Sequence, residues 1–381
     1  MQKRIIFPII YIVVLTALAF LPTGFERDIY YNAEGAKAKI LSVDNSTLLQ
    51  IGLFRDGEQR CEVELRSGSH KGEIHEAVNL FSGSLANDKV FTVGDVAWVL
   101  VEQDADDSVI FVNMIDHYRM NKELLLALVF AAALVAFAGW RGARTILSFI
   151  FSFLIVWKIL IPCSLKGIAP IPVAFFAGIL MSAATLLMVG GIKKASGAAF
   201  AGTLISSFFL LFLSWIVISI FQIDGTQLEW SESLLYSGFQ NLDLRALFQA
   251  AVYLGCLGAM MDLSIDVAIT MQEVENASPG ISSRLLFRSG LAIGRAGVGT
   301  QTTTLLFAYL SSYLAVLMVY MAQGTPVFNI LTSKTISSEI VQTLTGCIGL
   351  VAISPLTAVS YLLLGWLGRV KRHGAGKSES E

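Results

Sequence analysis

Apolar stretches of membrane length recur along most of the chain. A helix that spans a bilayer needs about 20 mostly apolar residues, and eight stretches approach or exceed this length. They cover residues 5–21, 124–140, 145–161, 171–189, 198–221, 247–270, 293–321 and 340–367. Pro162 is expected to close the third stretch, because proline cannot continue the helical ladder. The pattern predicts an α-helical polytopic membrane protein with about eight transmembrane helices.

Residues 30–116 follow a different pattern, in which apolar and polar residues alternate. Alternation of this kind is clear at 36–40, 61–65, 90–102 and 109–112, with turn-forming residues between the runs. Five or six short strands in fewer than a hundred residues predict a small β-barrel-like domain between the first two spans, and an OB-like barrel is among the folds that fit.

Composition supports the membrane class. The 381 residues are 55% hydrophobic and 15% charged, whereas soluble domains carry roughly 25% charged residues. The net charge of −2 hides a split, because residues 22–120 hold 17 acidic and 9 basic side chains, a balance of −8. That acidic balance argues against binding of nucleic acid or of anionic lipid by this domain.

Basic residues set the expected orientation. They flank alternate loops of the eight-span arrangement, at positions Lys3, Arg4, Arg141, Arg144, Lys193, Lys194, Arg284, Arg288, Arg369, Lys371, Arg372 and Lys377. Both termini are therefore predicted to be cytoplasmic. A cleaved signal peptide is the alternative for the first span, but its apolar run is long for one, which favours a retained anchor.

Four regions follow from these patterns. Residues 1–21 are predicted as an N-terminal transmembrane anchor, 22–120 as the extracytoplasmic β domain, and 121–368 as a seven-helix membrane domain. Residues 369–381 are expected to form a disordered cytoplasmic tail.

One helix stripe carries the most unusual chemistry. Gly255, Ala259, Asp262, Asp266 and Glu273 step by four, three, four and seven residues, which places them on one face of the sixth span. Gly255 and Ala259 are expected to let another helix pack closely. A carboxylate within a bilayer costs about 2.5–3.5 kcal/mol on insertion scales. The stripe is therefore expected to face a protein interior or a wet cavity.

The seventh span places polar residues opposite these carboxylates, in the run from Arg295 to Thr304. Three interpretations compete. Asp266 and Arg295 form a structural ion pair; or Asp262 and Asp266 bind a cation or proton in a cavity lined by the residues Thr300, Thr303 and Thr304; or Asp266 and Glu273 are simply solvated. The second is favoured, because Asp262 lies about 12 Å inside the span at the helical rise.

Other chemistry is weakly represented. Hydrolase, phosphate-binding and zinc-protease motifs are absent from the sequence, so we expect no enzyme, no catalytic residues and no cofactor. The histidines and glutamates of 69–76 match no metal-ligand spacing, and no metal site is expected. A Cys61–Cys163 disulfide stays open as an alternative. Pro355, inside the last span, predicts a helix kink.

These motifs resemble those of the YibE/F-like family of bacterial multi-pass membrane proteins. The resemblance rests on residues 258–266 followed by Glu273, on motif residues between Ile293 and Tyr309, and on 354–358. Members carry an acid after the motif arginine and an asparagine in the threonine run, where this chain has Ala296 and Thr303. The resemblance implies a bacterial cell (inner) membrane and leaves the chemistry open.

The expected function is transport of a small solute or ion, coupled through the carboxylates of the sixth helix. The alternative is a non-transporting envelope scaffold or signalling protein that acts through residues 22–120. Expected partners are the lipid bilayer, an unidentified small solute or ion, and an envelope protein or a second copy of the chain.

Overall fold

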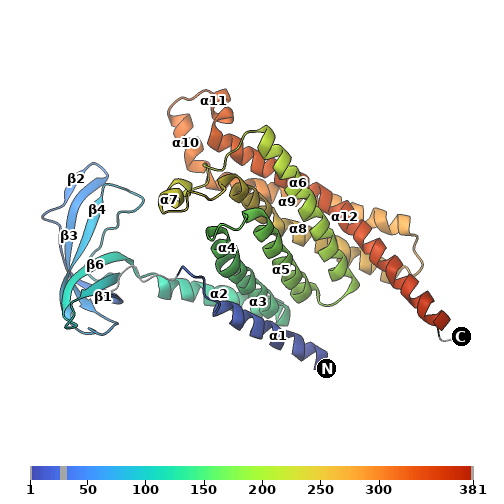
Figure 1. Ribbon diagram of the computed structural model, residues 1–381, viewed down its shortest axis with the longest axis horizontal. Helices are drawn as coiled ribbons and strands as arrows, with labels where there is room; N and C mark the ends of the chain where they lie inside the picture. Colours follow the sequence, from blue (N-terminus) through green and yellow to red (C-terminus); the bar gives the residue numbers. More distant parts are fainter. Residues whose placement is uncertain (1, 26–31, 379–381) are drawn as a thin grey trace. The chain divides into compact units, whose positions relative to one another are not determined.

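The computed structural model describes residues 2–25 and 32–378, with side chains for 11–25 and 32–367 (Figure 1). The chain forms two compact units. Residues 26–136 make the first, which we call the barrel unit, and residues 1–25 together with 137–381 make the second, the helical unit.

The barrel unit contains six strands. They are β1 (Ala33–Asp44), β2 (Leu49–Ile51), β3 (Phe54–Leu65), β4 (Ile74–Ser82), β5 (Val96–Gln103) and β6 (Val109–His117). Their order is β1-β5-β6-β4-β3-β2, and β1 also pairs with β3, so five strands close on themselves. All pairs are antiparallel except β4–β6, which is parallel and joins only two residue pairs. The predicted small β-barrel is confirmed as a five-stranded barrel, and the OB-like fold stays a prediction.

Alternation along the strands explains the barrel core. Ala36, Ala38 and Ile40 of β1 point inward, as do Cys61 and Val63 of β3, and all five are at most 1% exposed. Because successive side chains of a strand point to opposite faces, the intervening lysines and glutamates lie outside. Cys61 is a free thiol in this core, as is Cys163 in the helical unit, so the disulfide alternative is wrong.

Two strand predictions need correction. The run at 90–102 forms a strand only from Val96, because residues 92–95 make a turn in which Asp95 accepts hydrogen bonds from Thr92. Strand β4 was missed. It begins at Ile74, within the polar run that resembled a loop, and its inward positions Ala77 and Phe81 are buried.

The helices are longer than the apolar stretches that predict them. They are α1 (Gln2–Ala19), α2 (Met120–Ala138), α3 (Trp140–Ile155), η1 (Val156–Leu160), α4 (Ile161–Leu165), α5 (Pro170–Gly190), α6 (Lys194–Ile220), α7 (Ser231–Tyr236), α8 (Leu244–Ala277), α9 (Ser283–Ser312), α10 (Leu314–Ala322), α11 (Val327–Thr332) and α12 (Lys334–Ser378). α12 thus continues through 369–378, which the sequence placed in a disordered tail.

Six helical segments among the described residues are long and apolar enough to cross a membrane, and a seventh counts if α9 and α10 form one span. These two helices bend by 59° at Tyr313. Helix α1 adds an 18-residue apolar segment whose first side chains lie outside the described set. The structure therefore confirms a polytopic helical architecture, and the count of eight stays a prediction.

Pro162 does not end the third span. The chain passes from α3 through a π-helical turn, η1, directly into α4. Here the backbone N–H of Ile161 donates to Val156, five residues earlier, and Pro162 lies at the start of α4, where a missing N–H costs little. The fourth span ends at Gly190, because Gly191 takes a left-handed φ of 72° directly after α5.

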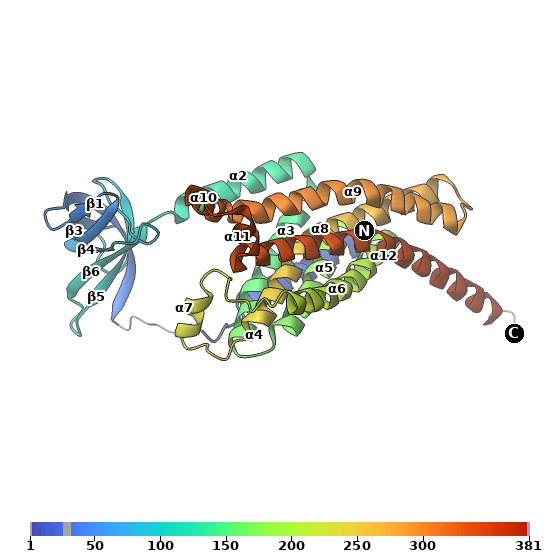
Figure 2. The same cartoon turned by 90° about the horizontal axis from the view of Figure 1, so that it is seen from above.

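Helix α8 lies at the centre of the helical unit and packs against α5, α6, α9 and α12 (Figures 1 and 2). Small residues allow these contacts. A methyl group on Gly178 of α5 would lie 2.7 Å from the Tyr253 ring, and one on Gly202 of α6 would lie 2.7 Å from the Thr357 Cα. Pro355 lies within α12 without ending it.

Candidate functional site

Helix α8 presents two faces of opposite character. It is 34 residues long, and its first turn is capped by the Asp243 side chain, which accepts a hydrogen bond from the Ala246 N–H at 2.9 Å. Asp262 is the nineteenth residue of this helix and so lies near its midpoint. At about 1.5 Å per residue the helix is roughly 51 Å long, which exceeds the thickness of a hydrocarbon core of about 30 Å.

The inner face of α8 is apolar and closely packed. Met260, Leu263 and Val267 are at most 1% exposed. The main polar contact on this face joins the fully buried hydroxyls of Ser264 and Thr203, which lie 2.9 Å apart. This face fixes α8 against α6 and α12, so it provides the rigid support for the opposite side.

The outer face carries the predicted carboxylates. Asp262 and Asp266 are both exposed in the single chain and make no hydrogen bond or ion pair with any described residue. They are four residues apart, which places their Cβ atoms about 6 Å from each other. Gly258 lies beside them, and nothing lies within 4 Å of the position that a Cβ would take there. Of the two expected surroundings, a protein interior is not found in the single chain, and the wet cavity stays a prediction.

Helix α9, which packs against α8, carries the predicted threonines and Arg295. Thr300, Thr303 and Thr304 are exposed, and each hydroxyl donates to a carbonyl of its own helix at 3.0 Å. Each hydroxyl oxygen therefore keeps lone pairs that a bound cation could use. Arg295 is also exposed, and in the described part of the chain it forms no ion pair with Asp266. The predicted Arg295–Asp266 bridge is not formed.

The other residues of the stripe, Gly255, Ala259 and Glu273, differ in their surroundings. A side chain at Gly255 would meet the Tyr309 hydroxyl of α9, which agrees with a packing role for this glycine. Ala259 is partly buried against the core. Glu273 is exposed near the end of α8. We call the surface formed by Gly258, Asp262, Asp266, Thr300 and Thr303 the open polar face.

Sequence reasoning missed another carboxylate. Glu339 of α12 is only 9% exposed, and its Oε1 has no hydrogen-bond partner among the described atoms. It lines a cavity of about 140 Å³ together with Tyr313, Thr343, Leu306, Leu310 and Ile336. The predicted span began at residue 340, one position too late, because an apolar window stops at the first charge. A window set by helix length would have included it.

A second polar cluster joins three helices at the other end of the unit. Lys194 of α6 lies 2.7 Å from the Glu275 carboxylate of α8, and the Tyr361 hydroxyl of α12 donates to the same carboxylate at 2.6 Å. The Lys194 ammonium also lies 4.0 Å from the Tyr361 ring centre. These contacts stabilise the ends of the helices, and they lie apart from the open polar face.

The barrel histidines contact a glutamate. His70 and His75 lie 3.2 and 2.8 Å from Glu73, and their hydrogen bonds hold the pKa of that carboxyl below its usual value. Within the described ranges, no group of three or more metal-ligand side chains comes together.

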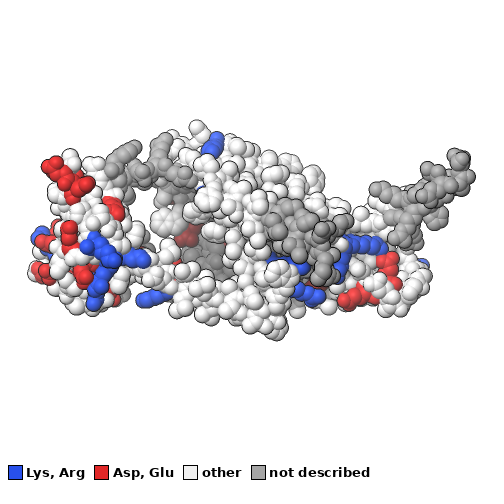
Figure 3. Space-filling view, turned by 90° about the horizontal axis from the view of Figure 1, so that it is seen from below, with Lys and Arg blue, Asp and Glu red and all other residues white. Residues whose placement is uncertain are grey.

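Charge is unevenly distributed over the helical unit. On the face shown in Figure 3, lysine and arginine side chains gather toward one end, beside acidic ones, and the middle is largely uncharged. The connections α5–α6 and α8–α9 lie at the end where Figure 1 marks the two termini. Lys193 lies in the first connection, and Lys194, Arg284 and Arg288 lie near the starts of the helices that follow, α6 and α9.

Long apolar helices around a central α8, together with an uncharged middle and polar ends, define a multi-pass membrane protein. The YibE/F-like protein family model matches residues 126–365, which is well over half of the chain, so the chain belongs to the YibE/F-like family. Comparisons with curated proteins and with solved structures find no match.

Proposed function

We propose that this protein carries a small solute or ion across the bacterial cell membrane, and that Asp262 and Asp266 of α8 couple the movement to a cation or proton. The observation that supports the proposal is the open polar face. Two carboxylates near the middle of a membrane-length helix have no partner within the described chain, and the adjacent helix α9 carries exposed threonine hydroxyls.

Such carboxylates cannot face lipid without a large cost, because hydrocarbon solvates charge poorly. They need water, a bound cation or another protein surface. A site that alternates between water and a bound cation meets this need, and it is also what coupled transport requires. In this proposal a second copy of the chain, or a moved helix of the same chain, covers the open polar face during the cycle.

The proposed orientation places both termini in the cytoplasm and the barrel unit outside. It is supported by Lys193, Lys194, Arg284 and Arg288, which flank the two connections drawn at the same end as the termini. Positively charged loops are retained on the cytoplasmic side of bacterial membranes.

Flux through reconstituted vesicles tests the proposal. Wild-type protein should give a pH- or cation-dependent flux across a panel of ions and metabolites. D262N should abolish it, because the amide keeps the size of the side chain and loses the charge. D262E should keep part of it. E273Q is the matched control, since Glu273 lies on the same stripe but near the end of α8, and its flux should match wild type.

The opposite outcomes would decide against transport. Equal flux in wild type and D262N, or no wild-type flux over the whole panel, would remove the coupling role of α8. The envelope scaffold, acting through the barrel unit, would then be the better description. The observation that favours this second candidate is an open cleft of about 1050 Å³ on the barrel unit, outside the helical bundle.

A further inference from the structure

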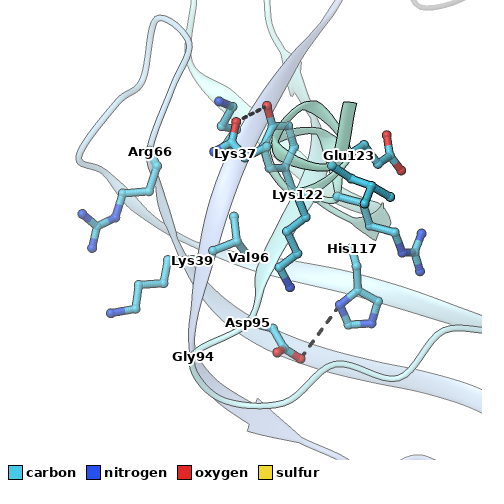
Figure 4. Close-up of a pocket in the computed structure, with 13 residues that line it drawn as sticks. Lys37, Lys39, Arg66, Gly94, Asp95, Val96, His117, Lys122 and Glu123 are labelled. Carbon is cyan, nitrogen blue, oxygen red and sulfur yellow. Dashed lines mark hydrogen bonds and ion pairs between the residues drawn. The ribbon is translucent and has the colours of Figure 1, made fainter. Parts of the chain in front are cut away.

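Basic side chains gather in that one cleft, although the barrel is acidic overall (Figure 4). Its lining includes Lys37, Lys39, Arg66, Arg119 and Lys122. Four of these belong to the nine basic residues of 22–120. The lining carboxylates are Asp95 and Glu123 only. The balance of −8 for the whole domain therefore conceals a local surface of the opposite sign.

Strand register explains why these residues meet. Lys37 and Lys39 alternate on β1 with inward alanines, so both point outward on the same face. Lys39 pairs with Val96 at the start of β5, and the next residue of β5 pairs with His117 at the end of β6. Helix α2 begins three residues after His117 and brings Lys122 to the same place. The cleft thus lies where the chain passes from barrel to apolar helix.

The three lysines are available to a ligand. Among the described residues, no carboxylate lies within 4.0 Å of the ammonium of Lys37, Lys39 or Lys122. Lys37 instead lies 4.4 Å from the centre of the Tyr118 ring. The two arginines differ, because each is bound to a nearby acid at 2.9 Å. The lysines therefore provide the free positive charge of the cleft.

Aromatic residues beside the cleft indicate where it lies relative to the membrane surface. The rings of Trp98 and Tyr118 lie 6.0 Å apart, and they line an adjoining cavity of about 550 Å³ with Met120. Tryptophan and tyrosine concentrate where a membrane protein meets the headgroup layer. Met120 is the first residue of α2, whose 19 residues have a mean hydropathy of 1.8. A span that begins there sets the cleft at headgroup level.

We propose that this cleft binds the phosphate group of an anionic glycerophospholipid, in the leaflet on the barrel side of the membrane. Its three unpaired lysines neutralise the phosphate, and Trp98 and Tyr118 contact the glycerol and upper acyl region. The domain-wide acidic balance argues against anionic lipid only when charge is summed over the barrel, whereas a headgroup meets the local surface.

Lipid retention by the full-length protein tests this. Protein extracted in mild detergent is offered phosphatidylglycerol, phosphatidylcholine or inorganic phosphate, and bound molecules are counted by native mass spectrometry. We expect wild type to retain phosphatidylglycerol in preference to phosphatidylcholine. The triple variant K37Q/K39Q/K122Q should lose about a hundredfold in this preference, given the attraction of each lysine near an anionic surface.

Two controls isolate the cleft. R55Q/K71Q/K89Q removes the same charge from barrel positions outside the cleft and should keep the wild-type preference, and K37R/K39R/K122R should keep it through retained charge. Thermal unfolding confirms that each variant is folded. Equal losses in the two glutamine variants, or no preference in wild type, would overturn the proposal. Displacement of the lipid by millimolar inorganic phosphate would also overturn it, because the site would then take a soluble anion.

Discussion

Carboxylates of the barrel unit and of the outer face of α8 differ in their polar contacts. On the barrel, Glu34 accepts hydrogen bonds from the Ser69 N–H and hydroxyl, and Glu73 contacts two histidines. On α8, Asp262 and Asp266 contact no described polar group. A carboxylate in water can be left alone at little cost, so pairing there is optional. Within a membrane an unpaired carboxylate is costly. Two aspartates without partners there would need water, a bound cation or another protein surface to solvate them.

The largest effect on stability should come from replacing a glycine at a helix contact, and a glycine on an exposed helix face provides the comparison. G202L places a large side chain against the Thr357 backbone and should force α6 and α12 apart, at a cost of about 3 kcal/mol in the free energy of unfolding. G258L, on the open polar face, has nothing within 4 Å of its Cβ and should cost less than 1 kcal/mol. Denaturation in mixed micelles measures both.

That pair also tests what covers the open polar face. If a second copy lies against Gly258, G258L should leave the unfolding free energy of the single chain unchanged and shift the protein from dimer to monomer in analytical ultracentrifugation. A large loss of stability in the monomer would instead mean that α8 is covered by its own chain.

A smaller effect is expected from the cluster at the ends of the helices. K194M removes the charged hydrogen bond to Glu275, and because both side chains are about one-third exposed, the cost should be only about 1 kcal/mol. K193M is the matched control, since the adjacent Lys193 is exposed and takes no part in the cluster. Thermal melting in detergent should separate the two variants, and equal melting would contradict a stabilising role for the cluster.

The smallest effect concerns the pH dependence of the barrel. Partial burial acts to raise the pKa of Asp95, but hydrogen bonds from Thr92 and the charges of His117 and Lys122 outweigh it and hold the pKa below its usual value. A lowered native pKa contributes stability that is present above the unfolded pKa near 3.9 and is lost as pH falls through the native value.

Barrel stability should therefore fall as the pH drops from 5 toward 2, and D95N should make that fall shallower. The difference between the variants should be less than about 1 kcal/mol. Circular dichroism of the β signal, followed against temperature at each pH, measures it. Identical pH profiles for the two proteins would show that Asp95 is not one of the groups responsible.

Sequence patterns predicted the strands and spans well where periodicity is strong. Alternation located β1 and β3, and apolar length located α5 and α6, because both signals reflect burial on one face or in lipid. Strand β4 was missed, since polar residues occupy two of its inward positions, His75 and the fully buried Asn79, and interrupt the alternation. Glu339 was missed for a related reason, because hydropathy ends a span where the first charge occurs although the helix continues.

The candidate site was predicted only in part. Helical spacing correctly placed Asp262 and Asp266 on one exposed face, and the alignment of the α9 threonines with them stays a prediction. Helical spacing could not show what this face contacts. Periodicity groups residues around the helix axis, but it does not identify the neighbouring helix that packs against each face. The Arg295–Asp266 pair failed for this reason, since matched depth on adjacent helices does not bring two side chains together.

The register of the barrel has a mechanical consequence. Strands β1 and β6 both run antiparallel to β5, with Ala33 opposite Glu102 and His117 opposite Ala97. The chain from α1 thus enters at one end of these three strands, and the chain to α2 leaves at the other. Tension between α1 and α2 therefore loads the β1–β5–β6 ladder in shear, so that its hydrogen bonds resist together instead of breaking one at a time. This arrangement favours high resistance of the barrel to unfolding by a stretching force.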